Sequence, residues 1–322
     1  MQDSRFAATP TQMPKPIRCS PIISSQQVQD YVREGYVVVP DLLTPSEVEQ
    51  LKDETLAIAR GQRQTSVISP LPQSVGDDEA LGRILCLHYA ACVSPVIHHY
   101  VARHPRVCGA LSQIVGAHLP FWDGSVKTVG SALYVKPPGF QGQAWHQDEV
   151  YLHTRDRSLT GAWIAIDDAS EENGCLSVIP GSQQSGYLWP HREHNEEDEW
   201  DEARESFSFD DSSRTAVEIG AGSAIFFSGY VLHGSFRNRS RHTRRSLVSH
   251  YMNAYSLMPY RFNPLADSTP TDDRKIELIA GSDPYAWKGT EDQGSDVFLR
   301  SCKANAHHTD LDAPRDSTST GS

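Results

Sequence analysis

The sequence predicts an α+β fold in which N-terminal helices pack against a β-sandwich or barrel. Apolar residues at helical spacing occur mainly before residue 116, and short β-rich runs separated by turn residues follow from residue 126. Helices and strands are therefore segregated along the chain and do not alternate as in parallel βαβ units. Many short strands with turn signals between them are typical of sandwiches and barrels.

Apolar spacing and helix-start residues define the helical half. Helices are expected at Ser24–Glu34, at Thr44–Arg60 and within Leu81–Gly116, where Pro95 and Pro105 break the pattern. The second helix is the best defined, because Thr44 and Glu47 form a capping box and Pro45 suits the first helical position. A short strand, Tyr36–Pro40, is expected between the first two helices.

The second half of the chain contains seven further runs with strand character. They are Thr128–Val135, Ala144–Leu152, Gly161–Asp167, Cys175–Ile179, Ala216–Ile219, Ser223–Ser228 and Ser246–Ala254. The segments between them are rich in Gly, Pro and Asn, which favour turns. We therefore expect these strands to build the β core.

The composition of the chain excludes several classes of protein. The 322 residues are 38% apolar and carry a net charge of −12, which argues against a cationic nucleic-acid binder and against attraction to anionic membranes. We see no apolar run of the roughly 18–20 residues that a membrane span needs and no secretory signal. The six cysteines form no C-x-x-C pair, so reduced thiols in a cytoplasmic protein are expected.

The predicted organisation is a single domain, residues 24–300, between flexible tails at residues 1–23 and 301–322, which are rich in polar residues. Within the domain, the acidic segment 190–213 interrupts the strands and is expected to be a surface loop or lid. Trp189 and Trp200 are its expected apolar anchors.

The run Trp145-His146-Gln147-Asp148 carries the clearest chemistry. In an extended strand, His146 and Asp148 project from one face while Gln147 points away. With His233 from a distant strand they would form a two-histidine, one-carboxylate site, which suits non-haem Fe(II). An H-x-D tripeptide alone is a weak signal, and His146 could equally be a hydrogen-bonded strand residue beside an acid.

A second feature is the pair Arg244-Arg245 at the start of a strand, where alternation lets only one of the two face inward. An inward arginine would need an anionic partner and can hold a carboxylate through two parallel hydrogen bonds. The alternative is a solvated basic turn, because Arg237, Arg239 and Arg241 lie close by in the sequence.

Several motifs occur together and in order. They are Glu34-Gly35-Tyr36-Val37-Val38-Val39-Pro40-Asp41-Leu42-Leu43, His146-Gln147-Asp148, Glu172-Asn173-Gly174-Cys175-Leu176, Pro180-Gly181-Ser182 and Leu232-His233-Gly234-Ser235 followed by Arg244. In this combination the chain resembles the phytanoyl-CoA dioxygenase family over about residues 28–254. That resemblance implies a double-stranded β-helix (jelly-roll or cupin-like) core, with the N-terminal helices packed on its major sheet, and an Fe(II)- and 2-oxoglutarate-dependent oxygenase.

The resemblance also implies roles for individual residues. His146, Asp148 and His233 would bind Fe(II), and Arg244 would hold the distal carboxylate of 2-oxoglutarate. Trp163, Ser235, Gln147 and Tyr134 match positions near the cosubstrate, although Trp163 and Tyr134 could also be core residues. A carboxylate at position 148 fills the coordination site that halogenating relatives leave open, which favours hydroxylation.

The expected activity is hydroxylation of a small organic substrate, namely an acyl-CoA, an amino-acid derivative or a natural-product intermediate, with O2 and release of succinate and CO2. A monomer or homodimer is expected, with no nucleic-acid or membrane partner. The alternatives are a cupin-like metalloenzyme that does not use 2-oxoglutarate, the same oxygenase site acting as a desaturase, cyclase or endoperoxidase, and a non-enzymatic binding protein.

Overall fold

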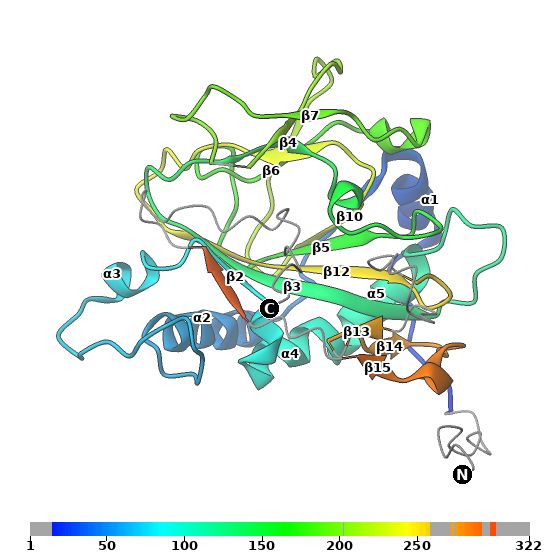
Figure 1. Cartoon of the computed structure of the whole chain (residues 1–322), viewed down its shortest axis with the longest axis horizontal. Coiled ribbons are helices and arrows are strands. Elements are labelled where there is room, and N and C mark those ends of the chain that lie inside the picture. The colour runs from blue at the N-terminus through cyan, green and yellow to red at the C-terminus, as the bar shows by residue number, and fades with distance from the viewer. Residues whose placement is uncertain (1–14, 202, 258–271, 274, 292–296, 301–322) are drawn as a thin grey trace, which may run out of the picture.

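The computed structural model describes residues 15–201, 203–257, 272–273, 275–291 and 297–300. Two antiparallel sheets lie face to face, and helices cover the outer side of the larger one (Figure 1). The larger sheet has the strand order β1 (Tyr36–Val39), β10 (Ala224–Ser228), β5 (Thr160–Ala165), β12 (Arg244–Asn253), β3 (Val126–Lys136), β2 (Cys86–His88) and β16 (Phe298–Arg300), and β14 (Leu278–Ala280) also pairs with β3. The smaller sheet has the order β4 (Gln143–His146), β11 (His233–Ser235), β6 (Leu176–Val178) and β9 (Thr215–Val217).

Two short pairs lie outside these sheets. They are β7 (His191–Arg192) with β8 (Glu205–Ser206) and β13 (Asp272–Asp273) with β15 (Thr290–Glu291). The first pair is a ribbon within the acidic segment, so that segment has regular structure where a plain loop was expected.

Local sequence determines where the helices begin. The α-helices are α1 (Ser25–Glu34), α2 (Pro45–Ala59), α3 (Asp77–Leu81), α4 (Pro95–Ala102) and α5 (Pro105–Ile114). Three of them start with proline at the first position, which lacks the N–H that would have no helical partner there. Short 3₁₀ turns occur at Ala90–Cys92, Asp148–Val150, Ser182–Ser185 and Ala286–Lys288. The prolines that seemed to interrupt one helical region are therefore the starts of separate helices.

The core has two layers, because neighbouring residues of each large-sheet strand face opposite sides. In β5, Ile164 packs in the cluster shared with the helices, whereas Trp163 packs in the cluster between the two sheets. The same division separates Phe226 from Phe227 in β10. Strands buried on both faces explain why these runs are continuously apolar in the sequence.

Two predicted secondary-structure segments need correction. The strand predicted at Ala144–Leu152 ends at His146, because the chain turns into a 3₁₀ helix at Asp148–Val150. The segment 81–116, predicted as helical, contains strand β2, which pairs with β3 and with the distant β16. A strand of three residues is too short to show an alternating apolar pattern, and it forms because β3 and β16 pair with it.

The predicted tail at residues 1–23 is too long. Its residues 15–23 are described, and among them Ile17 pairs with Gly281 while the backbone N–H groups of Ile22 and Ile23 donate to Gln113. Ile23 is buried in the helical core. Residues 1–14 and the predicted tail at 301–322 lie outside the described residues.

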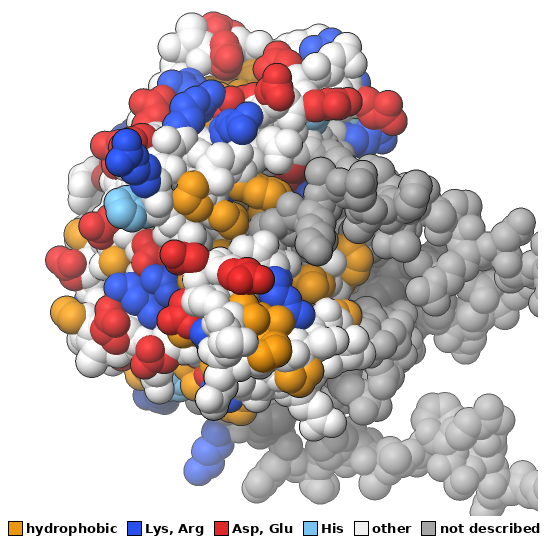
Figure 2. Space-filling model, turned by 90° about the vertical axis from the view of Figure 1, so that its left-hand side faces the viewer, with side chains coloured by type: hydrophobic (Ala, Val, Ile, Leu, Met, Phe, Trp, Pro, Cys, Tyr) orange, Lys and Arg blue, Asp and Glu red, His pale blue; other side chains and the backbone are white. Residues whose placement is uncertain are grey.

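On the face drawn in Figure 2, acidic and basic side chains are interspersed, so the net negative charge does not gather into one patch there. Within the described residues, no helix is both long and apolar enough to cross a bilayer.

Candidate metal centre

Two histidines meet where β4 and β11 pair in the smaller sheet. His146 and His233 are register partners, and their ring centroids lie 4.1 Å apart. In each ring, Nδ1 lies close to the carbonyl oxygen two residues earlier, at 2.8 Å for His146 and 3.0 Å for His233. Because a carbonyl only accepts, Nδ1 of each ring carries the hydrogen. Nε2 is then left with its lone pair for a metal in the neutral ring.

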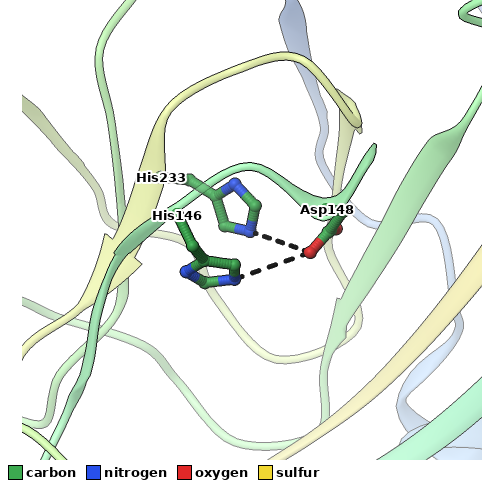
Figure 3. Close-up of side chains that lie close together, drawn as sticks. All are labelled: His146, Asp148 and His233. Carbon is green, nitrogen blue, oxygen red and sulfur yellow. Dashed lines mark ion pairs between the residues drawn. The ribbon is translucent and has the colours of Figure 1, made fainter. Parts of the chain in front are cut away.

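Asp148 completes the group from the turn that follows β4. Its Oδ1 lies 3.5 Å from Nε2 of His146 and 3.6 Å from Nε2 of His233, and all three side chains are buried (Figure 3). Gln147 is still extended and the chain turns only at Asp148. The sequence-based pairing of His146 with Asp148 is therefore correct in outcome, although the strand is shorter than predicted.

Protonation of the metal-free group follows from its neighbours. Burial lowers the pKa of His233 to about 4, and the adjacent His146 adds to that effect. Burial also opposes charge on His146, but Asp148 outweighs it and raises the pKa of His146. The pKa of Asp148 is well below its ordinary value despite burial, because His233 and His250 stabilise the carboxylate. In the metal-free group, Asp148 thus favours the protonated form of His146.

Sequence reasoning missed His250, which lies in β12. Its Nε2 is 2.8 Å from Oδ2 of Asp148, the oxygen that does not face the other two histidines. Strand alternation could have identified it, since His250 is six residues after Arg244 and shares its face of the sheet.

Arg244 is the arginine of the pair that faces inward. The alternative of a solvated basic turn therefore does not hold for Arg244. Its side chain is buried against the Trp163 ring, 5.0 Å from the ring centroid, while Arg245 forms a two-point ion pair with Asp167. Arg244 donates to Ser246 Oγ at 3.1 Å, and its Nε has no partner. Burial lowers its pKa to about 10. No carboxylate in the described part of the chain pairs with it, so this buried cation lacks an anion.

Lys136 lies beside Arg244, as its register partner on β3. Its buried ammonium donates to Ser235 Oγ at 2.6 Å and to the Phe236 carbonyl at 2.7 Å. Ser235 in turn donates to the Gly174 carbonyl at 2.9 Å. Burial, with Arg244 adding to it, holds the pKa of Lys136 well below its ordinary value. Sequence reasoning did not single out this lysine.

Tyr134 and Gln147 have different surroundings. Tyr134 lies between Cys86 and Ser246 and packs on the cluster between the sheets, where burial raises its pKa well above the ordinary value. Gln147 is fully buried, and its amide bonds the backbone of Tyr187, Trp189 and Tyr230. Trp163, Tyr134 and Arg244 are thus brought together between the sheets, whereas Gln147 holds the loop that leads into the acidic segment.

The acidic segment is attached near the metal site. The His191 ring lies 5.7 Å from Tyr151, whose ring is 6.3 Å from His146. Trp200 is buried against Phe236 with ring centroids 4.8 Å apart. Two of the acidic side chains have basic partners, Arg239 for Glu199 and Arg300 for Asp201. The basic run noted in the sequence therefore anchors this segment.

The fold and the site define a β-sandwich protein with a centre made of two histidines and one carboxylate. Residues 31–246, about two thirds of the chain, match the sequence model of the family described as phytanoyl-CoA dioxygenase (PhyH). The chain belongs to this family.

The chain is also similar to individual proteins in sequence and in structure. A phytanoyl-CoA dioxygenase from Arabidopsis thaliana is 34% identical over 124 residues, which are 38% of this chain and 43% of that protein, so the match spans less than half of its length. An ectoine dioxygenase from Bordetella parapertussis is 26% identical over 75% of this chain and 78% of that protein. The crystal structure of SnoK, described as a non-haem α-ketoglutarate-dependent carbocyclase from nogalamycin biosynthesis, covers 80% of this chain and 97% of its own. Its TM-score is 0.57 at 23% identity, which supports the fold.

Proposed function

We propose that this protein is an Fe(II)- and 2-oxoglutarate-dependent dioxygenase that hydroxylates a small organic substrate. The observation that carries the proposal is the convergence of His146 Nε2, His233 Nε2 and Asp148 Oδ1 in a buried group whose ligand atoms all lie within 4.8 Å of one another. Two neutral imidazoles and one carboxylate on one side of a site suit Fe(II) and leave positions open. We infer that the two sheets form the double-stranded β-helix of this enzyme class.

The cosubstrate assignment rests on Arg244. A guanidinium buried without an anion is costly, and a planar carboxylate is its best partner. The distal carboxylate of 2-oxoglutarate would satisfy it, with Trp163 covering one face of the guanidinium. A metalloenzyme that does not use 2-oxoglutarate would have no use for this unpaired cation, so the structure favours the oxygenase.

Each side chain then has a defined task. Bound Fe(II) with 2-oxoglutarate and O2 supplies oxidative decarboxylation to succinate and CO2, coupled to oxidation of a substrate C–H bond. His146 and His233 would hold the metal through Nε2, with their orientation kept by the Nδ1 bonds to backbone carbonyls. Asp148 would compensate part of the metal charge, and burial of all three excludes water from the metal side of the site.

We further propose that segment 190–213 is a lid over this site. Tyr151 lies next to His146 and His191 lies next to Tyr151, and the Trp200 and Asp201 contacts anchor the segment on the core. Loops that connect core strands commonly set specificity, so the choice of substrate would depend on this segment.

The test is release of succinate from 2-oxoglutarate by purified protein with Fe(II), screened against acyl-CoAs, amino-acid derivatives and natural-product scaffolds. We expect one substrate class to stimulate release and His146→Ala to abolish it. Products should be examined for ring closure as well as hydroxylation, since SnoK is described as a carbocyclase. Metal-dependent turnover of any substrate without 2-oxoglutarate would contradict the proposal.

A further inference from the structure

His250 lies against Asp148 although the two are 102 residues apart in the sequence. Its Nε2 and Asp148 Oδ2 are 2.8 Å apart, which is hydrogen-bond distance, and the His250 side chain is only 17% exposed. A carboxylate that coordinates a metal is ionised and can only accept, so the His250 N–H would be the donor.

The two oxygens of Asp148 have different surroundings. Oδ1 faces Nε2 of His146 and Nε2 of His233 at 3.5 and 3.6 Å, which is beyond normal hydrogen-bond length. Oδ2 holds the His250 N–H. A carboxylate oxygen that already accepts a strong hydrogen bond is a poorer metal ligand, and the bonded imidazole occupies the space beside it.

From this geometry, and resting on the metal site proposed above, we propose that His250 is a positioning residue that holds Asp148 with Oδ1 toward the metal and Oδ2 away from it. A carboxylate can bind a metal through one or both oxygens. In a six-coordinate site, one oxygen and two imidazoles leave three positions, which a two-point chelating cosubstrate and O2 both need. A second carboxylate oxygen would take one of those positions.

The larger sheet leaves space for the His250 ring. On β12, His250 pairs with Gly130 of β3 on one side and with Gly161 of β5 on the other, so neither cross-strand neighbour has a side chain on its face. The register between β12 and β3 shifts directly after His250, and such bulges re-aim side chains. A Cβ at Gly161 would come within 2.3 Å of the Phe227 ring, whose centroid lies 4.7 Å from that of the His233 ring.

The experiment measures Co(II) affinity of chelator-treated protein for four variants. His250→Leu removes the donor, His250→Gln keeps an amide N–H near the position of Nε2, and His250→Asn carries an amide too short to reach Oδ2. His98→Leu is the matched control, because it breaks another histidine–carboxylate contact, 2.6 Å from Glu277, outside the metal site.

We expect His250→Leu and His250→Asn to bind Co(II) about 10–100-fold more weakly, as is typical when an outer partner of a metal ligand is lost. His250→Gln should stay within about threefold of the wild type, because a donor remains. His98→Leu should bind as the wild type does. Rescue by glutamine distinguishes hydrogen-bond positioning from simple packing.

Three outcomes would count against parts of this account. A wild-type protein that binds no Co(II) would overturn the proposed function itself. Tight binding by wild type and by His250→Leu alike would overturn the positioning role alone. Equal loss in the leucine, asparagine and glutamine variants would also overturn it, because the hydrogen bond would then not be what positions Asp148.

Discussion

At the scale of residues, the metal centre depends on the tautomers and charges of a few buried groups. The backbone carbonyls of Ala144 and Val231 each accept a hydrogen bond from Nδ1, so both Nε2 atoms face Asp148. These atoms come from a strand end, a turn and a paired strand, and no single motif contains them all. Substitution of one ligand at a time therefore measures what each contributes to metal binding.

The first prediction concerns the two histidine ligands. His146→Ala and His233→Ala should each weaken Co(II) binding by more than about 100-fold, since loss of a ligand exceeds the 10–100-fold cost of losing an outer partner. Turnover should be abolished while circular dichroism stays unchanged. Wild-type metal affinity in either variant would show that the substituted histidine is not a metal ligand.

The second prediction concerns pH. Asp148 raises the pKa of His146, so a proton competes with the metal for its Nε2. Metal affinity should therefore be constant above that pKa and fall about tenfold for each pH unit below it. Isothermal titration with Co(II) at several pH values checks this, with proton release measured in buffers of different ionisation enthalpy. Affinity independent of pH between 5 and 8 would contradict it.

The third prediction concerns the cosubstrate anchor. Arg244→Gln should raise the KM for 2-oxoglutarate about 30- to several-thousand-fold, because loss of a buried charge-assisted pair costs about 2–5 kcal/mol. Arg244→Lys should retain only part of the affinity for 2-oxoglutarate, since lysine lacks the planar, two-point donor group of arginine. Arg245→Gln is the matched control, because Arg245 binds Asp167 and faces away from the site. A larger effect from Arg245 would show that the wrong arginine has been assigned.

At the scale of elements, one strand organises much of the site. Arg244, Ser246 and His250 share a face of β12, which also pairs with β3 and β5. The acidic segment is a second such element, because it begins at His191 beside Tyr151 and is anchored by Trp200 on Phe236.

The fourth prediction tests the segment as a lid. Trp200→Ala should raise hydrogen exchange across residues 190–213, since truncation of a buried tryptophan removes about 3–5 kcal/mol of packing. The KM for 2-oxoglutarate should stay near the wild-type value, while substrate preference changes or succinate release becomes uncoupled from product formation. Trp287→Ala is the control, because that ring is 66% exposed. Unchanged exchange and coupling would leave the segment an ordinary surface loop.

Helices and strands with strong local sequence signals could be predicted from the sequence. The capping box at Thr44 starts α2 as predicted, α1 lies where apolar spacing predicted a helix, and the long apolar runs became the central strands β3, β5 and β12. The short strands β2 and β16 were missed, because a three-residue strand has no period and depends on partners far along the chain. Lys136 was missed because its role arises from its cross-strand neighbour Arg244, whereas strand alternation from Arg244 could have identified His250.

At the scale of the whole molecule, the two layers of the core have different tasks. The layer between the helices and the larger sheet is mainly apolar, whereas the layer between the sheets contains the buried Arg244 and Lys136 and the metal centre. Buried polar groups that lack partners cost stability. Arg244, which has no anionic partner among the described residues, therefore lies on the side where metal and cosubstrate would bind.

The last prediction follows from this arrangement. The proposed metal would join β4 and β11 of the smaller sheet to the turn at Asp148, which His250 ties to the larger sheet. Metal that binds only the folded state should stabilise it by about 2.7 kcal/mol at 100 times its dissociation constant, and a chain of this size would then melt about 4 °C higher. Differential scanning calorimetry of chelator-treated protein with and without Co(II) measures the shift. His233→Ala serves as the control and should show no metal-dependent shift at the same concentration. An equal shift in that variant would mean that the stabilising metal binds elsewhere, because His233 belongs to no other metal-ligand group in the described part of the chain.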